Sequence, residues 1–135
     1  MRLEQVTETE LSIMQVIWAK GEPTSREIAE SLYEEVNDPK LSSVQKLLER
    51  LEAKGCIERD RGERAHRFRP RVSKDEFVEY RLQALADRLC EGSMAPLMST
   101  LLNSKGISKR DQRKFRQLID QLWPDTPSSK KKSRR

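Results

Sequence analysis

The sequence predicts a mainly α-helical fold with one small β-hairpin, and three observations lead to that prediction. Amphipathic helical patterns, each opened by a capping motif, cover most of the chain. Two short segments with strand character, residues 56–60 and 65–69, flank the tight turn 61–64. Residues 41–55 combine an apolar stripe with a basic outer face and end at a glycine. Three helices followed by a basic hairpin is the order of a winged helix-turn-helix.

Capping motifs mark the starts of the first two helices. Thr7 and Glu10 form a capping box before a helix expected to run to about residue 19. Thr24 and Glu27 form a second box, before a helix expected to end before residue 37. Pro23 lies between these helices, in a link that we expect to be extended and to pair with the hairpin as a small strand.

The third helix is the candidate recognition helix. Ser42 and Gln45 form a capping box of the Ser-x-x-Gln type, so we expect this helix to begin at Ser42 and to stop at Lys54 and Gly55. Its apolar stripe would face the core and leave a polar, basic face outside. The stripe consists of Val44, Leu47, Leu48 and Leu51.

The C-terminal half contains amphipathic helices without an evident core of their own. We expect a long helix capped by Ser73, a break at Gly92 and Pro96, a short apolar helix, and a last helix capped by Ser108. Such helices can bury their apolar stripes by interlocking in a two-fold dimer, which makes this half a helical dimerisation arm. The expected dimerisation residues are Phe77, Tyr80, Leu85, Leu89, Leu97, Leu101, Phe115, Leu118, Ile119 and Leu122.

These patterns divide the chain into a winged-helix DNA-binding domain (1–72), a helical dimerisation domain (73–123) and a disordered basic tail (124–135). The net charge of +5 is unevenly distributed along these parts. Residues 1–39 hold three basic and nine acidic residues, whereas residues 40–72 hold ten basic and five acidic ones. Positive charge therefore gathers on the recognition helix and hairpin, where the phosphates of DNA would attract it.

DNA binding is the function that this arrangement favours. The major groove admits one helix. From a helix in that groove, the Gln45 amide can pair with adenine, and Lys46 and Arg50 can reach guanine or phosphate. Arg61 and Arg64 at the hairpin tip can straddle a minor groove or its phosphates, and the start of the second helix faces the DNA backbone. The expected DNA-binding residues are Thr24, Ser25, Arg26, Ser42, Ser43, Gln45, Lys46, Arg50, Arg61, Arg64 and Arg67.

Catalysis, metal binding and membrane insertion are not indicated. The single histidine, His66, lies in an expected hairpin strand, and Cys56 and Cys90 are far apart, so neither an acid–base pair nor a four-ligand metal site is formed. Nucleotide-binding fingerprints are absent, and we expect neither an enzyme nor a cofactor. There is no signal-peptide pattern and no apolar stretch of the roughly 18 residues that a membrane span requires, and the cysteine usage fits a reducing cytoplasm.

Several stretches resemble the penicillinase-repressor family of bacterial transcriptional repressors, the BlaI/MecI/CopY type. They are residues 6–18, which end in Trp18, and residues 23–28, 41–55 and 64–70, the last with an aromatic residue at Phe68. The resemblance extends to about residue 122. It implies a homodimer with an N-terminal winged helix and a C-terminal helical arm, which represses transcription by occupying palindromic operators in double-stranded DNA.

The chain lacks two features of the family's signalling branches. The copper-responsive branch has a cysteine-rich metal motif near its C-terminus, but no cysteine follows Cys90 here. In the antibiotic-responsive branch a membrane sensor-protease triggers cleavage of the arm between an asparagine and a phenylalanine. The corresponding residues 97–102 do not contain that pair. Release through a sensor-protease signalling system would therefore require a different cleavage site.

Two alternatives to an operator-bound repressor stay open. A winged helix with a basic tail can be an interaction module for nucleic acid or protein, with binding that depends on salt but not on base sequence. The position of an operator relative to its promoter, rather than the fold, decides the sign of regulation. A transcriptional activator is therefore the other alternative.

Overall fold

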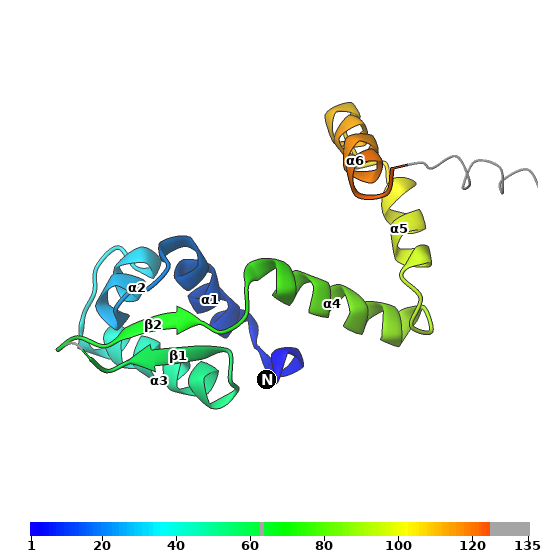
Figure 1. Cartoon of the computed structure of the whole chain (residues 1–135). Helices are drawn as coiled ribbons and strands as arrows, with labels where there is room; N and C mark the ends of the chain where they lie inside the picture. The colour runs from blue at the N-terminus through cyan, green and yellow to red at the C-terminus, as the bar shows by residue number, and fades with distance from the viewer. Residues whose placement is uncertain (63, 125–135) are drawn as a thin grey trace, which may run out of the picture.

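The helices and strands follow one another in the predicted order. A computed structural model describes residues 1–62 and 64–124, so the expected basic tail lies outside the described residues except for residue 124. The elements are η1 (Leu3–Gln5), α1 (Glu8–Lys20), α2 (Ser25–Leu32), α3 (Asp38–Ala53), β1 (Ile57–Asp60), β2 (Arg67–Pro70), α4 (Lys74–Leu89), α5 (Ala95–Leu102) and α6 (Lys109–Leu122). Figure 1 shows α1–α3 and the hairpin gathered in one module, from which α4 leads away.

Reciprocal capping contacts begin α1 and α2, as predicted. The N–H of Glu10 donates to Thr7 Oγ1 at 3.2 Å, and the N–H of Thr7 donates to Glu10 Oε1 at 3.0 Å. Thr24 and Glu27 exchange the same two bonds before α2. Each box satisfies two backbone groups at a helix start that lack partners within the helix.

The third helix begins one turn earlier than predicted. The expected start at Ser42 is wrong, because Asn37 is the N-cap and its Oδ1 accepts a bond from the N–H of Lys40 at 3.0 Å. Pro39 lies in the first turn, where its missing N–H would have no helical partner. Ser42 and Ser43 consequently lie inside α3, on its exposed face.

The hairpin is antiparallel, and a third short segment joins it. Ile57 lies opposite Pro70 and Asp60 opposite Arg67, so the second strand lies two residues later at its start and one later at its end than the predicted 65–69. The N–H of Phe68 donates to the carbonyl of Pro23 at 3.0 Å, next to an isolated bridge at residue 24. The prediction that the Pro23 link pairs with the hairpin is confirmed.

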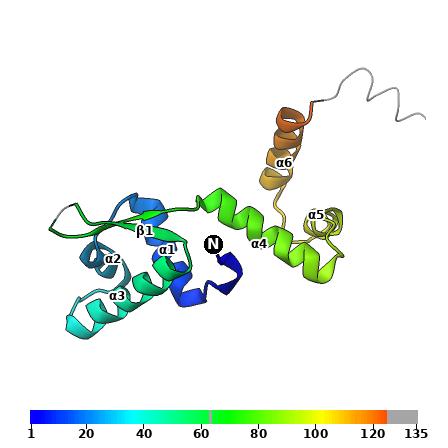
Figure 2. The same cartoon turned by 60° about the horizontal axis from the view of Figure 1, so that its bottom comes forward.

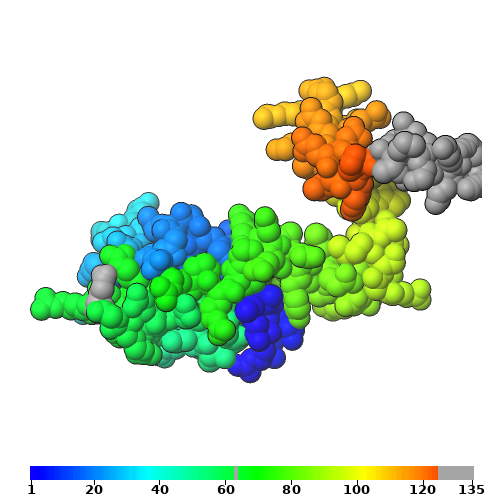
Figure 3. All heavy atoms as spheres, viewed as in Figure 1, coloured from blue at the N-terminus to red at the C-terminus, as the bar shows by residue number. Residues whose placement is uncertain are grey.

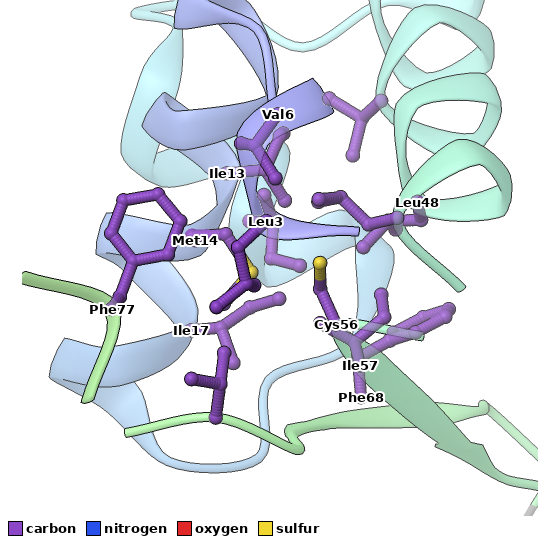
Figure 4. Close-up of a cluster of buried hydrophobic side chains, with 14 of the residues drawn as sticks. Leu3, Val6, Ile13, Met14, Ile17, Leu48, Cys56, Ile57, Phe68 and Phe77 are labelled. Carbon is purple, nitrogen blue, oxygen red and sulfur yellow. The ribbon is translucent and has the colours of Figure 1, made fainter. Parts of the chain in front are cut away.

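One hydrophobic core holds the module together (Figure 4). Burial of each large apolar side chain contributes about 1.5–3 kcal/mol, so this shared core is the main source of the module's stability. Its buried side chains come from every element between η1 and α4, and they include Leu3, Val6, Ile13, Met14, Ile17, Ile28, Val44, Leu48, Leu51, Cys56, Ile57, Phe68, Val72 and Phe77.

The first turns of α4 belong to the same core. Phe77 is 4% exposed, and its ring lies 5.4 Å from that of Trp18, centroid to centroid. The indole N–H of Trp18 donates to the carbonyl of Val72 at 2.9 Å. The expectation that Phe77 serves a dimer surface is wrong, because its ring already packs inside its own chain. Tyr80, expected on the same surface, is half-buried against this core.

Beyond these turns the arm extends away from the module. Figures 1 and 2 show α4 as a rod that ends at α5, with α6 further on, and Figure 3 shows that α6 touches little else. No side chain of α5 or α6 is buried in the described chain. The exposed large apolar side chains of the arm are Val78, Leu82, Leu85, Leu89, Met98, Leu101, Leu102, Leu118, Ile119, Leu122 and Trp123.

Candidate nucleic-acid interface

The outer face of α3 is polar and open to solvent. Val44, Leu48 and Leu51 are buried against the core, which turns the opposite side of the helix outward. Ser42, Lys46 and Arg50 succeed one another at intervals of four residues and therefore line up along one exposed side. Ser43 and Gln45 are exposed beside them. All five residues predicted on the recognition helix thus belong to one accessible surface.

A groove of about 600 Å³ separates α3 from the hairpin and the start of α2. It brings together predicted residues that are far apart in the sequence, since α2, α3 and the hairpin each contribute one wall. The lining residues are Thr24, Ser25, Arg26, Gln45, Glu49, Arg59, Arg64, Ala65, His66 and Phe68.

The α2 wall of this groove is suited to an anion. Thr24 caps α2, and Ser25 and Arg26 form its first turn, where the unpaired N–H groups carry partial positive charge. Arg26 lies 3.9 Å from Glu30, and both side chains are more than half exposed. Such an exposed pair contributes little, so the guanidinium can exchange this carboxylate for a phosphate.

The hairpin arginines differ in how firmly they are held. Arg61 is exposed and lies 3.8 Å from Glu52, and Arg64 is exposed at the groove. Arg67 is instead tied to the start of α2, since it donates to the carbonyl of Glu22 at 2.9 Å and lies 3.6 Å from Glu27. The structure therefore places Arg61 and Arg64 on the open surface, and Arg67 in the joint between hairpin and helix.

Arg59 is a groove residue that the sequence analysis did not single out. Its guanidinium lies 3.2 Å from the Glu52 carboxylate and 5.0 Å from the Phe68 ring centroid, and its Nη1 is 3.4 Å from His66 Nδ1. These contacts hold the hairpin against the last turns of α3. Only the strand register, which sets Arg59 opposite Phe68, could have indicated this role.

Glu49 is the second residue that the sequence analysis missed. It is exposed one turn after Gln45 and lines the same groove. A carboxylate can accept a bond from the amino group of cytosine but repels phosphate. The groove therefore carries a negative group as well as its arginines, and the four-residue interval from Gln45 was the signal that could have found it.

Neither a group of metal ligands nor a membrane-spanning helix occurs in the part of the chain that the structure covers. Among residues 1–62 and 64–124, no three histidine, cysteine or acidic side chains are grouped so as to hold a metal ion. Over the same residues, no helix is long and apolar enough to cross a membrane.

A helix-turn-helix with an exposed polar second helix, followed by a basic hairpin, defines the class of winged-helix DNA-binding proteins. The sequence model of the penicillinase repressor family matches residues 6–121, and the chain belongs to that family. Its members are transcriptional repressors rather than enzymes, so this chain is a DNA-binding transcriptional repressor. The predicted family, fold and non-enzymatic class are thereby confirmed.

Two relatives named as repressor or regulator are distant in sequence but match most of the chain. The penicillinase repressor of Bacillus licheniformis is 21% identical, over 89% of this chain and 93% of its own length. Transcriptional regulator BlaI of Mycobacterium tuberculosis is 29% identical, over 82% of this chain and 80% of its own. Among solved structures, a MarR family protein from Bacillus stearothermophilus is 21% identical with a TM-score of 0.47, covering 87% of this chain and 73% of that one.

Proposed function

We propose that this chain acts in the cytoplasm as a homodimer that binds palindromic operators in double-stranded DNA and blocks transcription from the promoters there. The observation that carries the proposal is the juxtaposition of the polar face of α3 with an arginine-bearing hairpin across one groove. An exposed helix of this kind fits the major groove, and each basic side chain beside it can replace counterions on a phosphate.

The residues of the proposed interface differ in whether they contact bases, contact phosphates or position the hairpin. Gln45, Lys46 and Arg50 read or approach base edges, because they lie on the exposed face of α3. Thr24, Ser25 and Arg26 contact the phosphate backbone, together with Ser42 and Ser43. Arg61 and Arg64 straddle the neighbouring minor groove and contact its phosphates, and Arg67 keeps the hairpin in position for them. The contacts to phosphate position the protein, and those to bases give specificity.

Dimerisation through the arm explains why the operator is expected to be palindromic. Leu85, Leu89, Leu118, Ile119 and Leu122 are exposed in the isolated chain, and Leu122 remains 67% accessible. Exposure of so many large apolar side chains on α4 and α6 is unfavourable in water and supports an interaction surface on the arm. A two-fold dimer covers it with the same residues of a second copy and sets two recognition helices in opposite directions. The remaining residues assigned to this surface are Leu97, Leu101 and Phe115, whereas Tyr80 packs against the core of its own chain.

Selection of bound duplexes from a random pool, at near-physiological salt and with full-length protein, tests the proposal. A palindromic motif is expected. Enrichment without any motif would leave a winged-helix module that binds nucleic acid through charge alone. An asymmetric motif would contradict the two-fold arrangement.

Release from DNA is proposed to follow cleavage of the arm. The α5 segment is exposed, and cutting it would separate α6 from the rest of the chain and divide the dimer surface. Both half-sites would then no longer be held at high effective concentration, and affinity would fall. A specific protease site inserted in the loop between α5 and α6, at residues 104–106, would also separate α6 from the rest of the chain and tests this route of release. Cleavage there is expected to weaken operator binding at least about tenfold, whereas unchanged binding would exclude this route of release.

A further inference from the structure

The N-terminal segment lies between the recognition helix and the dimerisation arm. Figures 1 and 2 both show the chain start beside α4 and near the C-terminal end of α3. Leu3 and Val6 are buried in the core, which fixes this segment at two points. We call residues 2–6 the N-terminal strut.

The strut is bonded to the last turn of α3 at three places. The backbone N–H of Arg2 donates to the carbonyl of Lys54 at 3.0 Å, and its guanidinium donates to the carbonyl of Ala53 at 2.8 Å. The ammonium group of Lys54 returns a bond to the carbonyl of Gln5 at 2.6 Å. The two bonds from Arg2 satisfy carbonyl groups at the helix end that have no partner within α3.

The strut is also bonded to α4. The Tyr80 hydroxyl donates to Glu4 Oε1 at 2.6 Å, and the Arg81 guanidinium donates to the carbonyl of Val6 at 3.0 Å while lying 4.8 Å from the Phe77 ring centroid. The bond between Glu4 and Tyr80 lowers the pKa of the carboxyl and raises the pKa of the phenol.

These contacts restrict how α4 can turn. Phe77 is the α4 side chain buried in the core, and a helix held there alone could pivot about it. Tyr80 and Arg81 attach the helix again roughly 5 Å further along its axis, on a different element. From Phe77 to Leu89 the axis of α4 runs about 18 Å, so a tilt of about 10° about Phe77 moves the far end of the helix by about 3 Å. That displacement is close to the rise of about 3.4 Å per base pair.

We propose that the N-terminal strut fixes the angle between the recognition helix and the arm and thereby sets the spacing of half-sites that the dimer accepts. Glu4, Tyr80 and Arg81 are its positioning residues. The inference rests on the proposed homodimer on a palindrome. It assigns to these residues no contact with DNA and none with the second copy.

Operators with altered spacing test the proposal. The full-length double variant Tyr80→Phe/Arg81→Met is compared with wild type on duplexes that carry the selected palindrome with one or two base pairs inserted or removed at its centre. Arg88→Met is the matched control, because Arg88 is an exposed arginine of α4 that, among the described residues, makes no hydrogen bond to the strut although it lies beside Glu4 and Val6. Wild type and control are expected to lose about tenfold or more in affinity per step away from the optimum, because each inserted pair also rotates one half-site about the DNA axis.

The double variant is expected to lose less than about threefold in affinity for each base pair inserted or removed. Its affinity for an isolated half-site is expected to be unchanged. A variant that was only less stable would instead lower binding to all duplexes alike. A spacing profile identical to that of wild type would overturn the proposal.

Hydrogen exchange without DNA separates this inference from the proposed function. In the double variant, amides of residues 2–6 and of the first half of α4 are expected to exchange faster, while those of α3 keep their protection. Unchanged exchange in α4 would overturn the strut even if palindromes are bound. If the selection yields no palindrome, the proposed function fails, and faster exchange would still show that the strut holds α4.

Discussion

The ammonium group of Lys54, at the C-terminal end of α3, is hydrogen-bonded to the carboxylate of Glu10, a side chain that is only 1% exposed. The same carboxylate accepts the backbone N–H of Thr7, within the capping box of α1. The buried Glu10 carboxylate therefore caps the start of α1 and also binds the C-terminal end of α3. Removal of either partner would leave the other buried without its counter-charge.

Acid is expected to weaken this joint. Burial alone would raise the pKa of Glu10, but the bonds from Lys54 and from the backbone of Thr7 outweigh it and hold the pKa below its ordinary value of 4.5. Because the folded state has the lower pKa, the stabilisation is complete above about pH 4.5 and is lost as the pH falls through the folded value. Denaturant unfolding from pH 7 down to pH 3 measures this loss.

The Glu10→Gln variant isolates the contribution of Glu10 from those of other acids. It is expected to be less stable by about 1–3 kcal/mol at pH 7, because Lys54 loses its charged partner. Its stability should depend less steeply on pH below 4.5 than that of wild type. Parallel pH curves for the two proteins would show that the pair does not contribute.

Loss of a recognition-helix cation is expected to weaken specific DNA binding. Lys46→Ala and Arg50→Ala each remove one exposed side chain of α3 and should cost about 1–3 kcal/mol on the selected operator. Fluorescence anisotropy with labelled duplex measures the dissociation constants. Arg88→Ala, which lowers the net charge equally, is expected to change affinity much less. Wild-type affinity in both α3 variants would contradict the assignment of α3.

The hairpin arginines are expected to act through phosphates. Arg64→Gln should weaken binding to specific and random duplexes alike and make the slope of log affinity against log salt shallower by about 1. Titrations between 50 and 300 mM salt on both duplexes give this slope, with Arg88→Gln as control. A loss confined to the specific duplex would indicate base reading by Arg64 instead.

Charge on the arm is expected to prevent dimerisation. The double variant Leu118→Asp/Ile119→Asp replaces two exposed apolar residues of α6 with carboxylates, which are costly to bury in an interface. Sedimentation should show a monomer that keeps the thermal stability of the winged-helix module and binds a full operator no more tightly than a half-site. An unaltered dimer would place the interface elsewhere.

Much of the fold could be predicted because its signals are short-range. The capping boxes at Thr7 and Thr24 were identified from residues three apart, and both are confirmed. The start of α3 was not, although Asn37 is a capping residue and a proline in the first turn, here Pro39, is typical of a helix start. In the structure Asn37 caps the helix, which continues through Pro39, and α3 is one turn longer than predicted.

Long-range contacts could not be predicted from the sequence for a different reason. Phe77 belongs to an amphipathic helix, and its pattern shows that one face is buried but not against which partner. Its ring packs on Trp18 in the module rather than on a second copy. Arg59 was missed because its place at the groove depends on the hairpin register.

The sequence by itself determined the order of elements, the apolar stripe of each helix, the basic character of the hairpin and the family, since all of these depend on neighbouring residues and their spacing. Only the tertiary structure decided which apolar stripes share one core. It also decided which arginine side chains are held by carboxylates and which are exposed to solvent. Tertiary contacts alone placed the N-terminal strut between α3 and α4, because they join residues more than 40 positions apart, such as Glu4 and Tyr80. Such contacts arise from packing in three dimensions, which local sequence patterns do not encode.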